Sequence, residues 1–119
     1  MSWLSKIFPS RPKVGPQQAQ ELLTQGAILL DVREDAEWRA GHAPKARHIP
    51  LGRLPARLRD VPPNRTVVTV CRSGARSSRA AALLAKEGRD VVNLTGGMNA
   101  WARAGLPVVA AGGRPGQVV

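Results

Sequence analysis

The chain has 119 residues, 43% of them hydrophobic and 22% charged, which is the length and composition of one globular domain and excludes a fibrous or disordered chain. A formal net charge of +10 raises nucleic-acid binding as a possibility. However, the 18 Lys and Arg residues are spread along the chain, with no basic run and no aromatic residues interleaved for base stacking. We therefore expect a solvated basic surface and a small anionic substrate, with no nucleic-acid partner.

Cysteine and histidine are too few for a metal site. The chain has one cysteine, Cys71, and two histidines, His42 and His48. A single cysteine excludes an intramolecular disulfide and a cysteine-based metal cluster. The two histidines are too few and too poorly spaced for zinc. We expect neither a metal nor a cofactor.

The two ends of the chain differ from the part between them. Residues 1–12 place Leu4, Ile7 and Phe8 on one helical face before a Pro-marked stretch, which predicts an N-terminal flap or linker packed on the domain, or a weak membrane-surface or partner contact. They lack the long apolar core and cleavage site of a signal peptide, so we expect no membrane span and a cytoplasmic location. Residues 111–119, rich in Gly and Pro, predict a flexible C-terminal tail. The domain itself is expected over residues 13–110.

Helical and strand patterns alternate along this domain. Apolar spacing predicts a helix at residues 17–25, a buried strand at 27–30 and a short helix at 35–40. A short strand at 46–50 and a helix of one or two turns at 51–58 follow. Five successive β-branched residues at 66–70 predict the strongest strand. A loop at 71–76, a helix at 77–87, a strand at 91–94 and a helix at 98–103 complete the pattern.

Strands that alternate with helices favour parallel pairing, right-handed crossovers and helices on both faces of the sheet. We therefore expect an α/β domain of three layers with a mainly parallel central sheet. Ligands of such sheets bind beyond the carboxyl ends of the strands. Asp31 and Cys71 both follow strands at such ends.

The loop after the strongest strand has the features of an anion cradle with a sulfur nucleophile. Cys71 precedes a helix N-terminus, where the helix dipole and free N–H groups favour the thiolate. Arg72 and Arg76 add positive charge, and Gly74 allows the backbone to curl so that N–H groups face inward. The alternative is an inert buried cysteine, which would not require these neighbours.

Five short motifs, taken together, resemble the rhodanese family over roughly residues 13–109. The motifs occur in the family's order: LDVRE at 30–34 with Glu37, GHAP at 41–44, HIP at 48–50, CRSGARS at 71–77 and GGMNAW at 96–101. The resemblance implies the three-layer rhodanese-like fold. It departs from the family where Lys45 replaces a glycine, which puts the geometry of that turn in question. The chain also has one domain, without the inactive partner domain of tandem members.

The resemblance also implies a sulfurtransferase that works in two steps. Cys71 would take the outer sulfur of a donor such as thiosulfate, hold it as a persulfide, and pass it to cyanide, a thiol or a protein acceptor. The loop amides would stabilise the persulfide, and two arginines would bind the anionic donor. The residues expected to bind substrate are Arg72, Ser73, Gly74, Ala75 and Arg76. The residues expected to support the site are Asp31, Arg33 and Ser77, the last as a helix cap.

Two other functions remain open at this stage. Phosphatases and arsenate reductases of the same fold carry a cysteine loop, but cell-cycle phosphatases have five residues between Cys and Arg, whereas four separate Cys71 from Arg76. A non-enzymatic interaction module is the second alternative, although inactive members of the family usually lose the cysteine. His42 is expected to stabilise a turn and Trp101 to lie in the core.

Overall fold

The computed structural model describes residues 12–119. Its central sheet has five strands in the order β1-β5-β4-β2-β3, and every neighbouring pair is parallel. The strands are β1 (Lys13–Val14), β2 (Ile28–Asp31), β3 (Arg47–His48), β4 (Val67–Val70) and β5 (Val91–Leu94). This parallel sheet confirms the expected fold class. Except for residue 12, the N-terminal flap or linker predicted over residues 1–12 lies outside the described residues.

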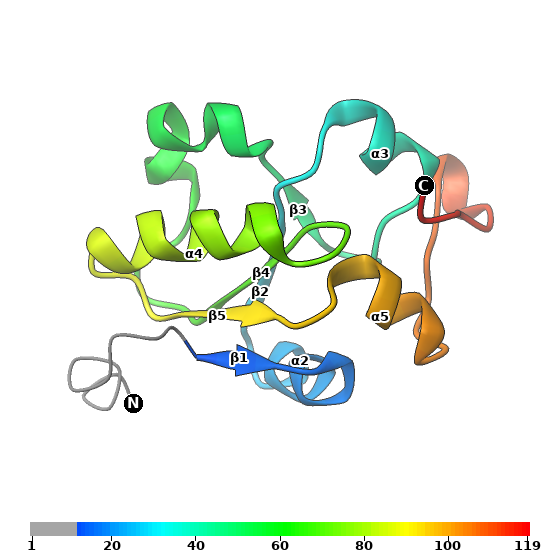
Figure 1. The fold of residues 1–119 in the computed structure, drawn as a ribbon, viewed down its shortest axis with the longest axis horizontal. Helices are drawn as coiled ribbons and strands as arrows, with labels where there is room; N and C mark the ends of the chain where they lie inside the picture. Colours follow the sequence, from blue (N-terminus) through cyan, green and yellow to red (C-terminus); the bar gives the residue numbers. More distant parts are fainter. Residues whose placement is uncertain (1–11) are drawn as a thin grey trace.

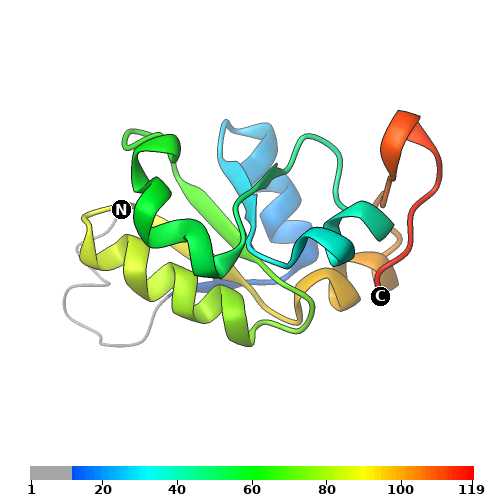
Figure 2. The same ribbon diagram turned by 90° about the horizontal axis from the view of Figure 1, so that it is seen from above.

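Helices cover both faces of the sheet, which is why β2 and β4 are buried at every position. On one face, η1 (Leu51–Asp60) and α4 (Ala75–Lys86) pack against β2 and β4 (Figure 1). On the other face, α2 (Pro16–Thr24) and α5 (Gly97–Arg103) pack against the same strands. The view from above separates α4 from α2 across the sheet (Figure 2). The three layers predicted from the alternating pattern are therefore confirmed.

Most predicted elements lie within two residues of their observed positions. The helix α3 (Asp35–Ala40) and the strand β5 have the predicted bounds. The helix α4 begins at Ala75 and not at residue 77, because Gly74 takes φ +118° and turns the chain directly into the helix. The strand β1 was not predicted, since two residues are too short to show a pattern and their register comes from pairing with β5.

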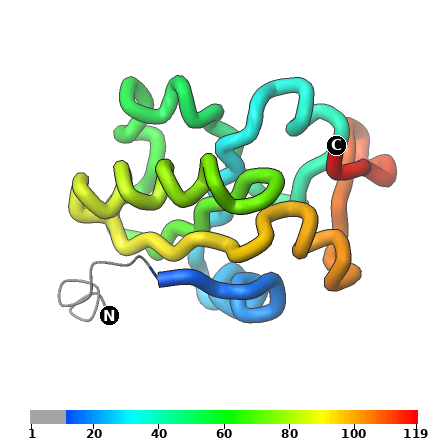
Figure 3. Tube along the Cα trace, viewed as in Figure 1, coloured from blue at the N-terminus to red at the C-terminus, as the bar shows by residue number. Residues whose placement is uncertain are grey.

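The C-terminal residues run back along the connection between α3 and β3 (Figure 3). His42 and Val109 exchange two backbone hydrogen bonds, at 2.9 and 2.8 Å, and the N–H of Gln117 donates to the carbonyl oxygen of Ala40 at 2.9 Å. A short 3₁₀ turn, η2 (Ala111–Gly113), lies between these contacts. These contacts brace the chain directly after α3, while the flexibility expected of residues 111–119 stays a prediction.

The turn in which Lys45 replaces the family's glycine keeps a glycine-like backbone. Lys45 has φ +65°, the one positive φ of a non-glycine residue within residues 12–119. A side chain with a Cβ is disfavoured in this left-handed region. Lys45 therefore carries backbone strain that a glycine at this position would avoid.

Within residues 12–119, no helix is both long and apolar enough to cross a membrane.

Candidate active site

Cys71 lies at the carboxyl end of β4, in the middle of the sheet. The residue is 1% exposed and packs in the apolar cluster beneath η1 and α4. The chain then turns through Gly74 into α4, so backbone N–H groups at the start of this helix and just before it lie close to the sulfur. This is the position expected from the sequence for a reactive group at the edge of a parallel sheet.

Two donors contact the sulfur directly. The backbone N–H of Gly74 donates to Cys71 Sγ at 3.1 Å, and the hydroxyl of Ser77 donates at 3.3 Å. The same hydroxyl lies 3.2 Å from the carbonyl oxygen of Gly74. Ser77 is therefore not the helix cap that the sequence suggested, since it lies inside α4 and its hydroxyl is directed at the thiol.

Burial and hydrogen bonds act on the pKa of the Cys71 thiol in opposite directions. Burial alone would raise the pKa of the Cys71 thiol, because a thiolate is poorly solvated there. The Ser77 hydroxyl and the backbone N–H groups of Ser77, Gly74 and Ser73 outweigh burial and lower the pKa below its ordinary value. The thiolate, the nucleophilic form, is thus favoured mainly by neutral donors rather than by the arginines of the loop.

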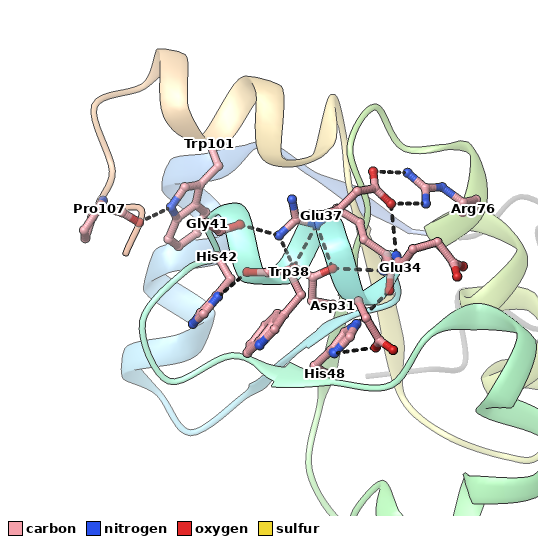
Figure 4. Close-up of polar contacts among 12 residues, drawn as sticks. Asp31, Glu34, Glu37, Trp38, Gly41, His42, His48, Arg76, Trp101 and Pro107 are labelled. Atoms are coloured by element: carbon pink, nitrogen blue, oxygen red, sulfur yellow. Dashed lines mark hydrogen bonds and ion pairs between the residues drawn. The ribbon is translucent and has the colours of Figure 1, made fainter. Parts of the chain in front are cut away.

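Arg76 is engaged by a carboxylate that comes from α3. Its Nη1 and Nη2 donate to Glu37 Oε1 and Oε2 at 2.6 and 2.8 Å, a bidentate pair (Figure 4). Glu37 also accepts the backbone N–H of Glu34 at 3.0 Å, at the start of α3. The guanidinium of Arg76 holds the pKa of Glu37 at about 2. Arg76 therefore ties the cysteine loop to α3.

Arg72 differs from Arg76 in its surroundings. Its side chain is exposed, and within residues 12–119 it forms no hydrogen bond or ion pair. Ser73 and Ala75 are also exposed beside it. Of the two arginines predicted to bind an anion, Arg72 is thus the one whose guanidinium is available at the rim of the loop.

Asp31 and Arg33 form a fully buried ion pair one strand away from Cys71. Arg33 Nη2 donates to Asp31 Oδ2 at 2.7 Å and Arg33 Nε to Oδ1 at 2.9 Å. Arg33 Nη2 also donates to the carbonyl oxygen of Gly41 at 2.7 Å. A buried pair of this kind fixes the backbone that it connects, here the segment containing α3. Asp31 and Arg33 therefore support the site indirectly, by fixing the segment that contains α3 and Glu37.

Two buried polar side chains that lie outside the sequence motifs support the backbone of the loop. Asn93 Nδ2 donates to the carbonyl oxygen of Gly74 at 3.2 Å, and Thr69 Oγ1 bridges Asn93 Oδ1 and the carbonyl oxygen of Ser77 at 3.2 and 3.0 Å. Both side chains are buried in neighbouring strands. A polar residue at an otherwise apolar buried strand position is the signal that could have identified them.

The segment at the start of α5 closes against the loop backbone. The N–H of Met98 donates to the carbonyl oxygen of Cys71 at 2.8 Å, and the N–H of Asn99 donates to that of Arg72 at 3.1 Å. A Cβ placed on Gly97 would lie 2.5 Å from the carbonyl oxygen of Arg72. Gly97, the second glycine of the GGMNAW motif, is therefore required for this close approach.

The side chains of His42, His48 and Trp101 each contact a backbone carbonyl oxygen (Figure 4). His42 Nδ1 lies 2.7 Å from the carbonyl oxygen of Trp38, and its ring stacks on the indole at 3.6 Å between centroids. His48 stacks on the same indole at 4.7 Å. Trp101 is 1% exposed and its Nε1–H donates to the carbonyl oxygen of Pro107 at 2.8 Å. The core position expected for Trp101 is confirmed.

The chain is similar in sequence and in fold to known proteins. A sulfurtransferase from Allochromatium vinosum is 47% identical over 88 residues, which cover 73% of this chain and 82% of that protein. The thiosulfate sulfurtransferase GlpE of Pseudomonas syringae is 34% identical over 90 residues, covering 75% and 85%. A rhodanese-related protein from Thermoplasma volcanium has a TM-score of 0.78 at 26% identity, covering 82% and 97%.

The family model described as a rhodanese-like domain matches residues 15–104. The chain belongs to this family. The resemblance drawn from the five motifs is therefore confirmed.

Proposed function

We propose that this protein is a sulfurtransferase that carries sulfane sulfur as a persulfide on Cys71. The observation that carries the proposal is the sulfur's environment: a hydroxyl and a backbone N–H group donate to Sγ at 3.3 and 3.1 Å, and the pKa of the thiol is lowered. A site that stabilises a thiolate also stabilises the anion of a persulfide, whose charge lies one atom further out. The sulfurtransferase names of two relatives support the same reaction class.

The first step moves one sulfur atom to the enzyme. The Cys71 thiolate attacks the outer sulfur of thiosulfate, a new S–S bond forms, and the bond to the sulfonate sulfur breaks. Sulfite leaves with the electron pair of that bond. The product is the Cys71 persulfide anion, so no oxidant, reductant or proton is required.

The second step returns the enzyme to its starting state. A thiophilic acceptor, which is cyanide in an assay and a thiol or protein thiol in the cell, attacks the outer sulfur of the persulfide. The S–S bond breaks and its electron pair remains on Cys71 as the thiolate. Both steps use one sulfur atom and one anion-binding loop, which is consistent with a chain that has a single cysteine.

The two arginines of the loop take different roles in this proposal. Arg72, exposed at the rim, pairs with the sulfonate of the donor. Arg76, held by Glu37, positions the loop by tying it to α3. Ser73, Gly74 and Ala75 contribute backbone N–H groups to the anion.

The burial of Cys71 favours a sulfur donor over a phosphate ester. The residue is 1% exposed, so a reactant must be narrow at its reacting end. The terminal sulfur of thiosulfate is a single atom, whereas a phosphate ester presents a tetrahedral group. With four residues between Cys71 and Arg76, the loop is also one residue shorter than that of cell-cycle phosphatases. We infer a cytoplasmic setting for the reaction, because a reducing compartment keeps a lone reactive thiol free.

The reaction can be tested with two assays on the same preparation. Thiocyanate formation from thiosulfate and cyanide should be robust in the wild type and absent in Cys71→Ser, while circular dichroism shows both variants folded. Hydrolysis of an aryl phosphate should be negligible in both. Phosphatase turnover without thiocyanate formation would overturn the proposal, and the absence of both activities would favour an interaction module.

A further inference from the structure

A cavity of about 430 Å³ lies away from the cysteine loop, between α2, the turn before β3 and the end of α5. Its apolar wall includes Leu23 of α2, Ile28 of β2, and Trp101 and Pro107 near the end of the chain. A volume of this size is typical of pockets that hold a small organic molecule. Nothing in the proposed sulfur transfer uses this cavity.

The cavity and the cysteine loop occupy opposite ends of the sheet. Ile28 begins β2, whereas Cys71 follows the last residue of β4, and these parallel strands pair with Ile28 opposite Val67. Strands of this length separate their two ends by about 10 Å, since each residue rises about 3.3 Å. The cavity also lies on the side of α2 and α5, whereas Cys71 packs on the side of α4. A ligand in the cavity would therefore not contact the reacting sulfur.

Three cations and no carboxylates belong to the cavity lining. Lys45, Arg47 and Arg65 all line it and all are exposed to solvent. Within residues 12–119 none of them takes part in an ion pair. Arg65 is held in place by donating from Nε to the carbonyl oxygen of Gly26 at 2.8 Å. The lining thus combines an apolar wall with an unneutralised positive rim.

The backbone of Lys45 supplies an independent observation. This residue is held at φ +65°, where glycine would avoid the strain of a Cβ. A strained backbone position next to a cavity is a common feature of binding sites. Lys45 thus puts a cationic side chain at the rim, at the cost of backbone strain, whereas a glycine there would contribute no side chain.

We propose that this cavity binds a small organic anion with an apolar body, such as an aliphatic carboxylate. The apolar chain would lie against Leu23, Ile28 and Pro107, and the carboxylate would meet Lys45 and Arg47 at the rim. An anion without an apolar body would gain only from exposed charges, which are worth little in water. A neutral apolar molecule would leave the cations unpaired. The combination therefore selects molecules that are both apolar and anionic.

The proposal is tested by titrating octanoate, 1-octanol and inorganic phosphate into ¹⁵N-labelled protein. Octanoate should shift the amide signals of Thr24, Ala27 and Lys45 and leave those of residues 71–77 in place. It should bind more tightly than either of the other two probes. Shifts confined to residues 71–77, equal affinity for octanoate and octanol, or no octanoate shift at millimolar concentration would each overturn the proposal.

Matched variants separate the charge of Lys45 from its backbone strain. Lys45→Gln should weaken octanoate binding about two- to fivefold, the effect of one exposed charge pair. Lys86→Gln, which removes an exposed lysine from the last turn of α4, should leave the affinity unchanged. Lys45→Gly should weaken binding to the same extent and yet raise the melting temperature, because it relieves the strain. Unchanged affinity in both Lys45 variants would contradict the proposal.

A titration with an acidic peptide distinguishes a small ligand from a protein partner. A hexaglutamate peptide carries anionic charge without an apolar body, so its affinity for the cavity should be no higher than that of phosphate. Tight binding of this peptide at the same amides, with no response to octanoate, would assign the cavity rim to an acidic protein and overturn the proposal. None of these readouts depends on sulfur transfer, so failure of this proposal can be distinguished from failure of the proposed function.

Discussion

Replacing Ser77 by Ala removes the side-chain donor nearest to the reactive sulfur. The hydroxyl lies 3.3 Å from Cys71 Sγ and 3.2 Å from the carbonyl oxygen of Gly74, and its single proton serves one of them at a time. Ionisation of the thiol should draw that proton to the sulfur. The variant therefore loses a hydrogen bond to the thiolate while the backbone donor at Gly74, 3.1 Å away, remains.

The size of the effect follows from this geometry. A hydrogen bond to a charged group contributes about 1.5–3 kcal/mol, and the shared proton and the 3.3 Å distance place this one at the lower end. Since one pKa unit corresponds to about 1.36 kcal/mol, Ser77→Ala should raise the pKa of Cys71 by about one unit. Alanine fits the buried position without a clash because it removes only one atom.

The pKa can be measured through the alkylation of Cys71 by iodoacetamide across a pH series. The chain has one cysteine, so the rate reports this thiol alone. The midpoint of the rate profile is the readout, because the limiting rate at high pH also changes with thiolate basicity. Ser78→Ala is the matched control, since Ser78 is exposed at the next position of α4. A Ser77→Ala midpoint equal to that of wild type would refute the role assigned to the hydroxyl.

Three further variants test the loop and its supports. Arg72→Ala should lower kcat/KM for thiosulfate about 10- to 150-fold, the loss of about 1.5–3 kcal/mol, and affect a neutral or monoanionic donor less; equal losses for both donors would mean that Arg72 only supports the loop. Glu37→Gln should lower the free energy of unfolding by about 1–2 kcal/mol near neutral pH, a partial value because Glu37 and Arg76 are partly exposed. The pKa of Glu37, about 2, lies below that of a glutamate in the unfolded chain. The stabilisation that ionised Glu37 gives the fold is therefore complete above the ordinary glutamate pKa and is lost as pH falls toward 2. The free energy of unfolding, measured with urea across this pH range, should accordingly change less with pH in Glu37→Gln than in the wild type. Gly97→Ala should destabilise the protein and slow sulfur transfer, because the new Cβ would lie 2.5 Å from the carbonyl oxygen of Arg72. Gly105→Ala is the control, since it has a similar positive φ but open space around the Cβ and so measures the effect of backbone strain alone. Equal melting temperatures and rates in these two variants would contradict the close-approach argument.

The sequence was sufficient for the fold because its signals are local. The β-branched run that became β4 and the apolar run that became β2 are continuous in the chain, and helices between them require parallel pairing. By contrast, β1 consists of Lys13 and Val14, whose strand conformation depends on pairing with β5 far along the chain. No local pattern carries that information.

The candidate site was predictable in its position and less so in its electrostatics. The cysteine, the glycine and the arginines of the loop are adjacent in sequence, so their gathering at one strand end could be inferred. The sequence predicts that Arg76 binds the donor, because nothing close to Arg76 in the chain shows that it is already paired. Its partner, Glu37, is 39 residues away and comes next to Arg76 only through the packing of α3. The sequence predicts Ser77 as a helix cap because no local pattern shows that α4 starts two residues earlier, directly after Gly74.

The central claim is that Cys71 carries the transferred sulfur, and the mass of the intact protein tests it most directly. Incubation with thiosulfate followed by removal of the donor should add one sulfur atom to the wild type, and subsequent cyanide should remove it. Cys71→Ser should show no such gain. A protein that forms thiocyanate without gaining a sulfur atom, or a gain that persists in Cys71→Ser, would contradict the account.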